Sequence, residues 1–152
     1  THMSYCYLNA IRWILGTPTV VSALASAGVL GEAERVQEET CAALVGFENG
    51  AFLSATASYI RPEKMTDAET RFICSAGGIQ VDDSTLTVFR GAQSETQSFV
   101  AEPSAFVRQA DAFLDAVELR TAARNPPADA LLDLQIAEAI SLSAREQRTV
   151  TL

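Results

Sequence analysis

The chain has 152 residues, enough for one ordinary domain with a core of its own, and its 48% hydrophobic and 20% charged residues are typical of globular proteins. The formal net charge of -8, from 11 Lys and Arg against 19 Asp and Glu, argues against a nucleic-acid partner and gives no help in binding anionic membranes, because both need a basic surface. No apolar stretch is long enough to predict a membrane-spanning helix.

The first predicted element is a helix over residues 5–15 that is apolar on nearly every side. Gly16 and then Thr17-Pro18 give it a stop signal. A helix of this kind is buried in a core or against a partner. A short β-branched strand over 19–26 and a polar connection over 27–37 follow.

Two apolar runs on either side of Glu48-Asn49-Gly50 predict a tight β-hairpin, because Asn and Gly both tolerate positive φ. Side chains alternate along its second strand. One face is expected to carry Phe52, Ser54, Thr56 and Ser58, and the other Leu53, Ala55 and Ala57. The first of these faces is small and polar, so it is not simply core.

More strands are predicted over 71–76, 79–81, 84–91 and 96–102, with Gly77-Gly78 as a turn between the first two. Asp82 and Asp83 either pair for acid–base chemistry or lie in a solvated turn. Their place before Ser84, at a strand junction, favours the turn.

The period changes after Pro103, where apolar residues recur every three or four positions and predict a helix ending near Arg124-Asn125. Pro126-Pro127 interrupts the chain before a second helix, whose predicted inner face is Leu131, Leu134, Ala137 and Ser141. A last strand is predicted over 148–152. The fold class is α+β: a mostly antiparallel sheet with helices packed on one face.

Cys6, Cys41 and Cys74 are too far apart for a zinc site or a redox pair, and each lies in an apolar segment. We expect them to be buried small residues in a reducing compartment, and hence a cytoplasmic protein. The single His, His2, lies at the end of the chain, where we expect neither a catalytic relay nor a metal. The Cys spacing and the single terminal His therefore predict no metal. No glycine-rich phosphate loop is visible, so the sequence also predicts no cofactor in this chain.

Tyr5, Asn9 and Arg12 are spaced i, i+4 and i+7, so they share one stripe of the first helix. Polar groups on an otherwise buried helix must find partners. They either satisfy backbone groups at the sheet edge or line a pocket. In a pocket, Tyr5 would be a candidate proton donor, and Asn9 and Arg12 candidate substrate anchors.

Three stretches in this order resemble a known family: YCYLNAIRWILGTPTVVSA, ETCAALVGFENGAFLSATAS, and the closing helices and strand FVRQADAFLDAV and NPPADALLDLQIAEAISLSAREQRTVTL. Together they cover nearly the whole chain. They resemble the C-terminal domain of the glucose–fructose oxidoreductase, inositol dehydrogenase and rhizopine-catabolism superfamily (Gfo/Idh/MocA). The resemblance implies one α+β domain over residues 1–152, without the family's Rossmann domain. Residues 1–3 are a possible cloning remnant.

In that family, the Rossmann domain binds NAD or NADP. The second domain shapes a pocket for sugars, polyols or other cyclic alcohols, and the outer face of its sheet commonly makes dimers. The family's motif at the helix start, Asp-x-Gly-x-His or Tyr, would place its last residue on Cys6, or on Tyr5 after a shift of one residue. The resemblance therefore implies that Cys6, Asn9 and Arg12 bind substrate. The small polar face of Ser54, Thr56 and Ser58 suits either a pocket wall, in which case these three residues also bind substrate, or a sheet-on-sheet interface.

Three functions stay open at this point. The first is a substrate-binding and dimerisation domain that cannot transfer hydride alone, because NAD or NADP would need a Rossmann domain. The second is a free-standing, cofactor-independent isomerase, lyase or cyclase with a small-molecule substrate between helices and sheet. The third is a non-catalytic dimer scaffold. All three include a homodimer through the sheet face.

Overall fold

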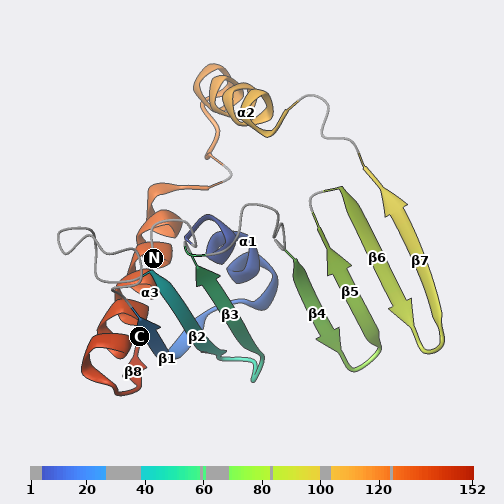
Figure 1. The fold of residues 1–152 in the computed structure, drawn as a ribbon. Coiled ribbons are helices and arrows are strands. Elements are labelled where there is room, and N and C mark those ends of the chain that lie inside the picture. Colours follow the sequence, from blue (N-terminus) through green and yellow to red (C-terminus); the bar gives the residue numbers. More distant parts are fainter. Residues whose placement is uncertain are drawn as a thin grey trace. The chain divides into compact units, whose positions relative to one another are not determined.

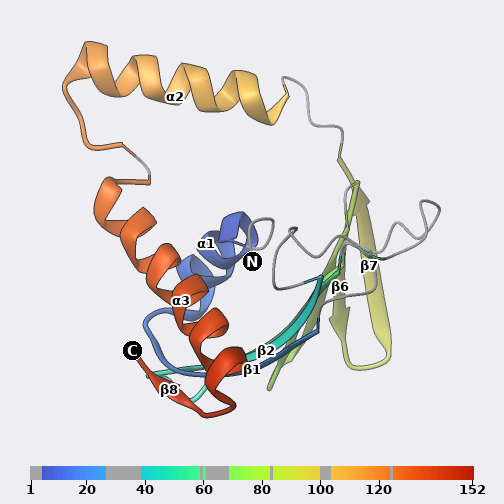
Figure 2. The same cartoon turned by 60° about the vertical axis from the view of Figure 1, so that its left-hand side comes forward.

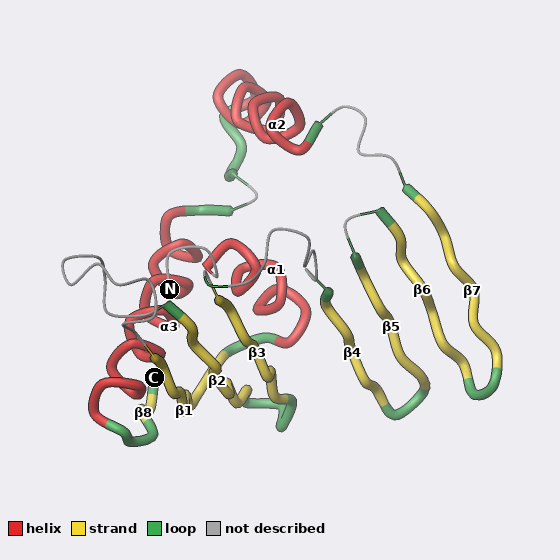
Figure 3. Tube along the Cα trace, in the orientation of Figure 1, coloured by secondary structure: helices red, strands yellow, loops and turns green. Residues whose placement is uncertain are grey.

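The structure, a computed structural model, describes residues 5–26, 39–58, 60, 69–82, 84–99, 104–123 and 125–152, without the side chains of Tyr5 and Cys6. This part of the chain forms three helices and eight strands (Figures 1 and 3). They are, in order, α1 (Tyr5–Leu15), β1 (Pro18–Ser26), β2 (Thr40–Phe47), β3 (Phe52–Ser58), β4 (Thr70–Cys74), β5 (Gly77–Val81), β6 (Thr85–Arg90), β7 (Gln93–Ser98), α2 (Ala105–Leu119), α3 (Pro127–Glu146) and β8 (Val150–Thr151).

The strands form two four-stranded sheets, and the α+β class predicted from the sequence is confirmed. The first sheet has the order β3-β2-β1-β8 and the second the order β4-β5-β6-β7. Every pairing is antiparallel. The chain divides into two compact units, of which Thr1–Pro62 with Asn125–Leu152 holds the first sheet, and Glu63–Arg124 holds the second sheet and α2.

The core of the described residues lies between one face of the first sheet and two helices. Figure 2 shows α1 and α3 on the same side of β1 and β2. The sheet contributes Val21, Ala23, Ala43 and Val45, and the helices contribute Leu8, Ile136, Ala139 and Ile140. Full burial of each larger aliphatic side chain stabilises the fold by about 1.5 to 3 kcal/mol, so this interface holds the unit together. The predicted packing of helices on one sheet face is confirmed here.

The predicted hairpin joins β2 to β3 at Asn49 and Gly50. The N–H of Phe47 donates to the carbonyl of Ala51 at 2.9 Å, and Gly50 has a φ of 81°. The Asn49 side chain accepts from the N–H of Ala51 and donates through Nδ2 to the carbonyl of Leu15 at 2.9 Å. The turn therefore also caps the C-terminal end of α1, which the sequence pattern alone did not indicate.

The second sheet corrects one prediction about glycine. Gly77 and Gly78 begin strand β5, and the turn lies two residues earlier than predicted, at Ser75 and Ala76. A Cβ on Gly77 would lie 2.1 Å from the carbonyl oxygen of Phe89, so glycine is needed there because β6 passes so closely. The last strand of this sheet also begins earlier than expected, at Gln93.

Asp82 lies in a turn between β5 and β6. Its carboxylate accepts from the N–H groups of Ser84 at 2.8 Å and Thr85 at 2.7 Å, and from the Thr85 hydroxyl at 2.7 Å. These contacts are those of an exposed turn, which is the alternative that the sequence favoured for Asp82. Asp83 lies outside the described residues.

Helix α2 begins after Ser104, whose Oγ accepts from the N–H of Val107. It ends at Leu119, five residues before the predicted end near Arg124, because Arg120 adopts a left-handed conformation with a φ of 52°. None of its residues is buried.

Helix α3 buries a different face from the predicted one. Leu131 and Leu134 are exposed, and the buried residues are Asp133, Ile136, Ala139, Ile140 and Ser143. Both stripes have helical spacing, so periodicity cannot choose between them. The buried stripe is joined to the sheet by hydrogen bonds, since the Ser143 hydroxyl accepts from the N–H of Ala23 at 2.9 Å and donates to the carbonyl of Arg148 at 2.6 Å.

Candidate functional site

A polar cluster joins α1 to α3 inside the first unit. Arg12 Nε donates to Asp133 Oδ1 at 2.9 Å, and Arg12 Nη2 lies 3.4 Å from Asp129 Oδ1. Asn9 Nδ2 donates to Asp133 Oδ2 at 2.6 Å and to Asn125 Oδ1 at 3.1 Å. Two of the three polar residues of the predicted α1 stripe, Asn9 and Arg12, therefore have side-chain partners on or next to α3.

This cluster is largely removed from water. The side chains of Arg12 and Asp133 are 11% and 5% exposed, while that of Asp129 is 29% exposed. Both carboxylate oxygens of Asp133 accept a hydrogen bond, one from a charged donor. Such charge-assisted bonds are among the stronger ones in proteins, and removing one partner from a buried pair leaves an uncompensated charge. The cluster is therefore sensitive to any change in either partner.

Asn9 also connects α1 to the place where the chain returns to the first unit. The second unit ends at Arg124 and the first resumes at Asn125, whose side chain accepts from Asn9. The α3 helix begins two residues later, at Pro127. One asparagine side chain thus contacts both the return point and the helix that follows it.

The structure brings part of the predicted substrate set together. Tyr5 and Cys6 form the first turn of α1, and Asn9 and Arg12 follow along the same helix. The side chains of Tyr5 and Cys6 lie outside the described residues, so the described geometry of this set consists of the Asn9 and Arg12 contacts.

Ser54, Thr56 and Ser58 lie on the other face of the first sheet. Their cross-strand partners are Leu44, Ala42 and Thr40, in that order, and none of these six belongs to the core between sheet and helices. Ser58 Oγ and Thr40 Oγ1 are hydrogen-bonded at 2.7 Å. The predicted alternation along β3 holds, and it separates these hydroxyls from Asn9 and Arg12 by the thickness of the sheet.

The open face of the first sheet also exposes large apolar side chains. Leu24, Leu44 and Phe52 are all exposed, and the register of the three strands places them with Ser54 and Thr56 on this face. A face of small hydroxyl and alanine residues with a few large apolar ones is suited to packing against another flat surface.

Sequence reasoning placed Asp129 in the first turn of α3, but it missed Asp129 and Asp133 as partners of Arg12. A signal was available, since Asp129, Asp133, Ile136 and Ile140 are spaced by four, three and four residues and share one helix face. A carboxylate within an apolar stripe requires a partner, and Arg12 on the other apolar helix was the available cation.

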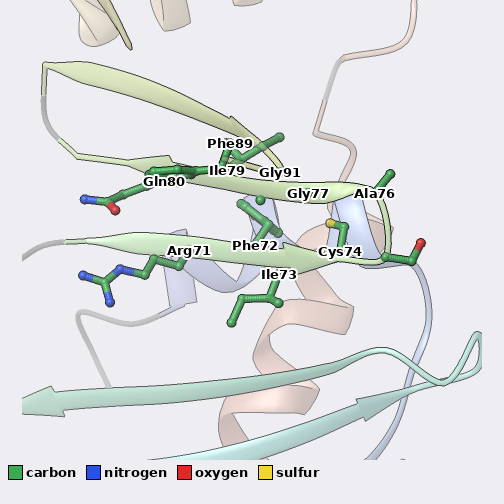
Figure 4. A pocket seen from close by; sticks show the side chains of 12 residues that line it. Arg71, Phe72, Ile73, Cys74, Ala76, Gly77, Ile79, Gln80, Phe89 and Gly91 are labelled. Carbon is green, nitrogen blue, oxygen red and sulfur yellow. The ribbon is translucent and has the colours of Figure 1, made fainter. Parts of the chain in front are cut away.

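The second unit contains a shallow groove of about 550 Å³ at the β4–β5 hairpin (Figure 4). Cys74 lies near the turn end of the groove, and Arg71 and Gln80 lie toward the other end. Cys74 is exposed and Cys41 is half-buried, so the expectation of buried cysteines is wrong for Cys74 and too strong for Cys41. Glu69 raises the pKa of Arg71, mainly through a hydrogen bond and then through its charge. The side chains that line the groove offer no buried polar group for a ligand.

The described residues include no group of three or more His, Cys, Asp and Glu that could hold a metal ion. No helix in the same ranges is long and apolar enough to cross a membrane. A dinucleotide binds at the carboxyl edge of parallel strands, whereas every pairing in the described sheets is antiparallel. The described residues therefore do not fit NAD or NADP by themselves.

A family model described as "Oxidoreductase family, C-terminal alpha/beta domain" matches residues 1–152. The fold is similar to that of aldose-aldose oxidoreductase from Caulobacter crescentus complexed with glycerol, at 23% identity and a TM-score of 0.85, over 98% of this chain and 46% of that chain. Levoglucosan dehydrogenase in complex with NADH is similar at 17% identity and a TM-score of 0.84, over 98% of this chain and 48% of that chain. An oxidoreductase from Agrobacterium radiobacter in complex with NAD+, L-tartaric acid and magnesium is similar at 18% identity and a TM-score of 0.81, over 98% of this chain and 47% of that chain.

The chain thus spans less than half of the length of each of these three proteins. At these identities the likeness shows a shared fold. No curated protein matches the sequence.

Proposed function

Because the chain belongs to the Gfo/Idh/MocA oxidoreductase family, as its C-terminal α/β domain, we propose that it is the substrate-binding and dimerisation half of an NAD- or NADP-dependent enzyme. The nucleotide would be held by a separate Rossmann domain, since the described residues do not fit it. The substrate class proposed is a sugar, polyol or cyclic alcohol. The names of the similar aldose-aldose oxidoreductase and levoglucosan dehydrogenase support this class.

The observation that carries the proposal is the difference between the two faces of the first sheet. One face is covered by α1 and α3, which are tied together by Arg12 and Asp133. The other is open and lined by small residues with exposed Leu44 and Phe52. We assign the substrate to the start of α1 on the helix side, and self-association to the open face.

On the helix side, Tyr5 is the proposed proton donor and Cys6 takes the place of the family's His or Tyr. Asn9 and Arg12 complete the proposed substrate set. Since Nε and Nη2 of Arg12 are directed to α3, its Nη1 group is the proposed anchor. A bound hydroxylated ring would exchange its water for such fixed donors at little further cost in orientation.

On the open face, Ser54, Thr56 and Ser58 are proposed to pack against the same strands of a second copy. Small side chains let two sheets approach closely, and the exposed apolar residues supply the buried area. A two-fold interface uses the same patch on both copies, so one substitution alters it twice.

Sedimentation velocity at tens of micromolar tests the association. The chain is expected to be a homodimer, and Leu44→Lys to be a monomer because it places two charges in the interface. Leu131→Lys is the matched control, since Leu131 on α3 is 57% exposed and Leu44 is 52% exposed. A monomeric parent chain, or equal dissociation by both variants, would contradict the assignment of the open face.

Titration of glycerol, D-glucose, myo-inositol and levoglucosan, followed by backbone amide shifts, tests the substrate side. Saturable shifts are expected for residues of α1 with at least one of the four. NADH added alone is expected to give no saturable shift. Shifts confined to the second unit, or none with any of the four, would remove the substrate role.

A further inference from the structure

Asp133 is the shared acceptor of the polar cluster, and its burial makes its role distinct from that of a surface charge. We propose that Asp133 is a positioning residue that sets where the first turn of α1 lies, by holding α1 at Asn9 and Arg12 together. This inference rests on the proposed function only in assigning the substrate to that turn. The positioning itself depends on the contacts of the cluster.

The geometry of the cluster fixes α1 in two respects. Asn9 and Arg12 are three residues apart on α1, and they donate to the two oxygens of one carboxylate, at 2.6 and 2.9 Å. A single planar acceptor with two donors nearly one turn apart restricts both rotation of the helix about its axis and sliding along α3, because hydrogen bonds require distance and direction.

The apolar contacts of α1 do not impose the same restriction. Leu8 is buried in the core, and Ile11 and Leu15 pack against it on the same side of the helix. Apolar burial depends on the area removed from water and is not directional, so several rotations of α1 would satisfy it almost equally. The carboxylate selects one of them.

Stability alone does not account for a buried ion pair at this place. Replacing both partners of such a pair by well-packed apolar residues is often neutral or stabilising, and the best-attested use of buried polar groups is to fix register. Asp133 lies in the stripe with Ile136 and Ile140, where an aliphatic residue would suit the helix spacing equally well. We therefore assign the charge to the orientation of α1.

Three variants of the chain test the proposal. Asp133→Asn keeps the shape but turns one acceptor into a donor that opposes either Asn9 or Arg12. The double variant Asn9→Asp with Asp133→Asn reverses the hydrogen bond between these positions, and the amide oxygen introduced on α3 remains to accept from Arg12. Glu138→Gln is the control, because it removes one charge from the exposed side of the same helix.

Amide hydrogen exchange, read residue by residue by NMR, measures how firmly the turn is held in place. Asp133→Asn is expected to speed exchange at the first described amide protons bonded in α1 by about tenfold more than in β1 and β2, because local opening differs from global unfolding. The double variant should recover most of the loss, and Glu138→Gln should match the parent. Equal acceleration in α1, β1 and β2, or no acceleration in α1, would overturn the proposal.

The four-ligand titration is then repeated to separate this proposal from the proposed function. If the parent binds, Asp133→Asn should weaken binding by about tenfold, and unchanged affinity despite faster exchange in α1 would overturn the link to substrate. If the parent binds none of the four, the substrate role fails and the exchange result alone decides the positioning role. If Asp133→Asn does not fold, Asn9→Ala takes its place, because it removes one of the two donors to Asp133. Exchange in α1 should then be faster than in β1 and β2, by a smaller factor. If exchange in α1 is not faster in Asn9→Ala, the proposal is equally overturned.

Discussion

Substitution of Arg12 by Met is the most direct test of how the two helices are held together. Met keeps the aliphatic reach of the side chain and removes the guanidinium, so Asp133 stays buried with one donor, Asn9, in place of two. Asp129, at 3.4 Å from Arg12 and partly exposed, loses a partner that water can replace. The cost therefore comes mainly from Asp133.

The magnitude follows from burial. Breaking a buried ion pair by removing one partner costs about 3 to 5 kcal/mol. The lower end applies here, because the carboxylate keeps its hydrogen bond from Asn9 and Arg12 is itself 11% exposed. With a urea dependence of about 2 kcal/mol per molar, a loss of about 3 kcal/mol lowers the unfolding midpoint by about 1.5 M.

The assay is urea unfolding followed by tryptophan fluorescence and by circular dichroism. Trp13 is the single tryptophan of the chain and lies on α1 next to Arg12, so fluorescence reports this helix. Arg145→Met, at an exposed position in the last turn of α3, controls for loss of an arginine. The double variant Arg12→Met with Asp133→Leu removes both charges and should recover most of the midpoint.

Two results would refute this reasoning. A fall of the midpoint no larger for Arg12→Met than for Arg145→Met would mean that the pair is effectively solvated. A double variant as unstable as Arg12→Met alone would mean that the guanidinium acts by packing and not by compensating the charge of Asp133.

Two further predictions concern the second sheet. Gly77→Ala should destabilise this sheet far more than Gly91→Ala, because a Cβ on Gly77 meets the carbonyl oxygen of Phe89 at 2.1 Å whereas a Cβ on Gly91 meets nothing within 4 Å. The measurement is the loss of amide-exchange protection in β5 and β6. Equal losses in the two variants would contradict the prediction. The pKa of Asp82 is held below its ordinary value first by the hydrogen bond from the Thr85 hydroxyl and then by backbone N–H groups, so Thr85→Val should raise it, as measured by an NMR titration of the carboxyl carbon. Because that pKa is lowered, the hydrogen bonds of Asp82 stabilise the turn fully at a pH above the ordinary carboxylate pKa. This stabilisation is lost as the pH falls through the pKa of the folded state. An unchanged pKa in Thr85→Val would show that the hydroxyl bond is not the main cause.

Most elements of this fold could be predicted from the sequence, because their signals are local. The helix over residues 5–15 is confirmed at both of its ends, and Asn49-Gly50 marks its hairpin correctly. These features depend on neighbours in the chain, such as the positive φ that Gly50 takes and the stop at Gly16. The family was also correctly indicated by the order of three stretches.

Local signals gave the wrong prediction where the same residues are compatible with two different structures. Gly77-Gly78 is as suitable for a turn as for a strand that passes close to Phe89, and only the neighbouring strand decides. The strands predicted for one sheet form two, because strand pairing depends on contacts far apart in the chain.

The candidate site shows the same division. The sequence by itself determined that Asn9 and Arg12 share one stripe of an apolar helix and must find partners, since helical spacing and the cost of burying a polar group are local facts. Only the tertiary structure decided that the partner is Asp133, more than a hundred residues away, and that Leu131 and Leu134 face outward on the same helix. Which of two equally periodic stripes is buried depends on what the opposing helix and sheet present to it, and no window along the chain contains that information.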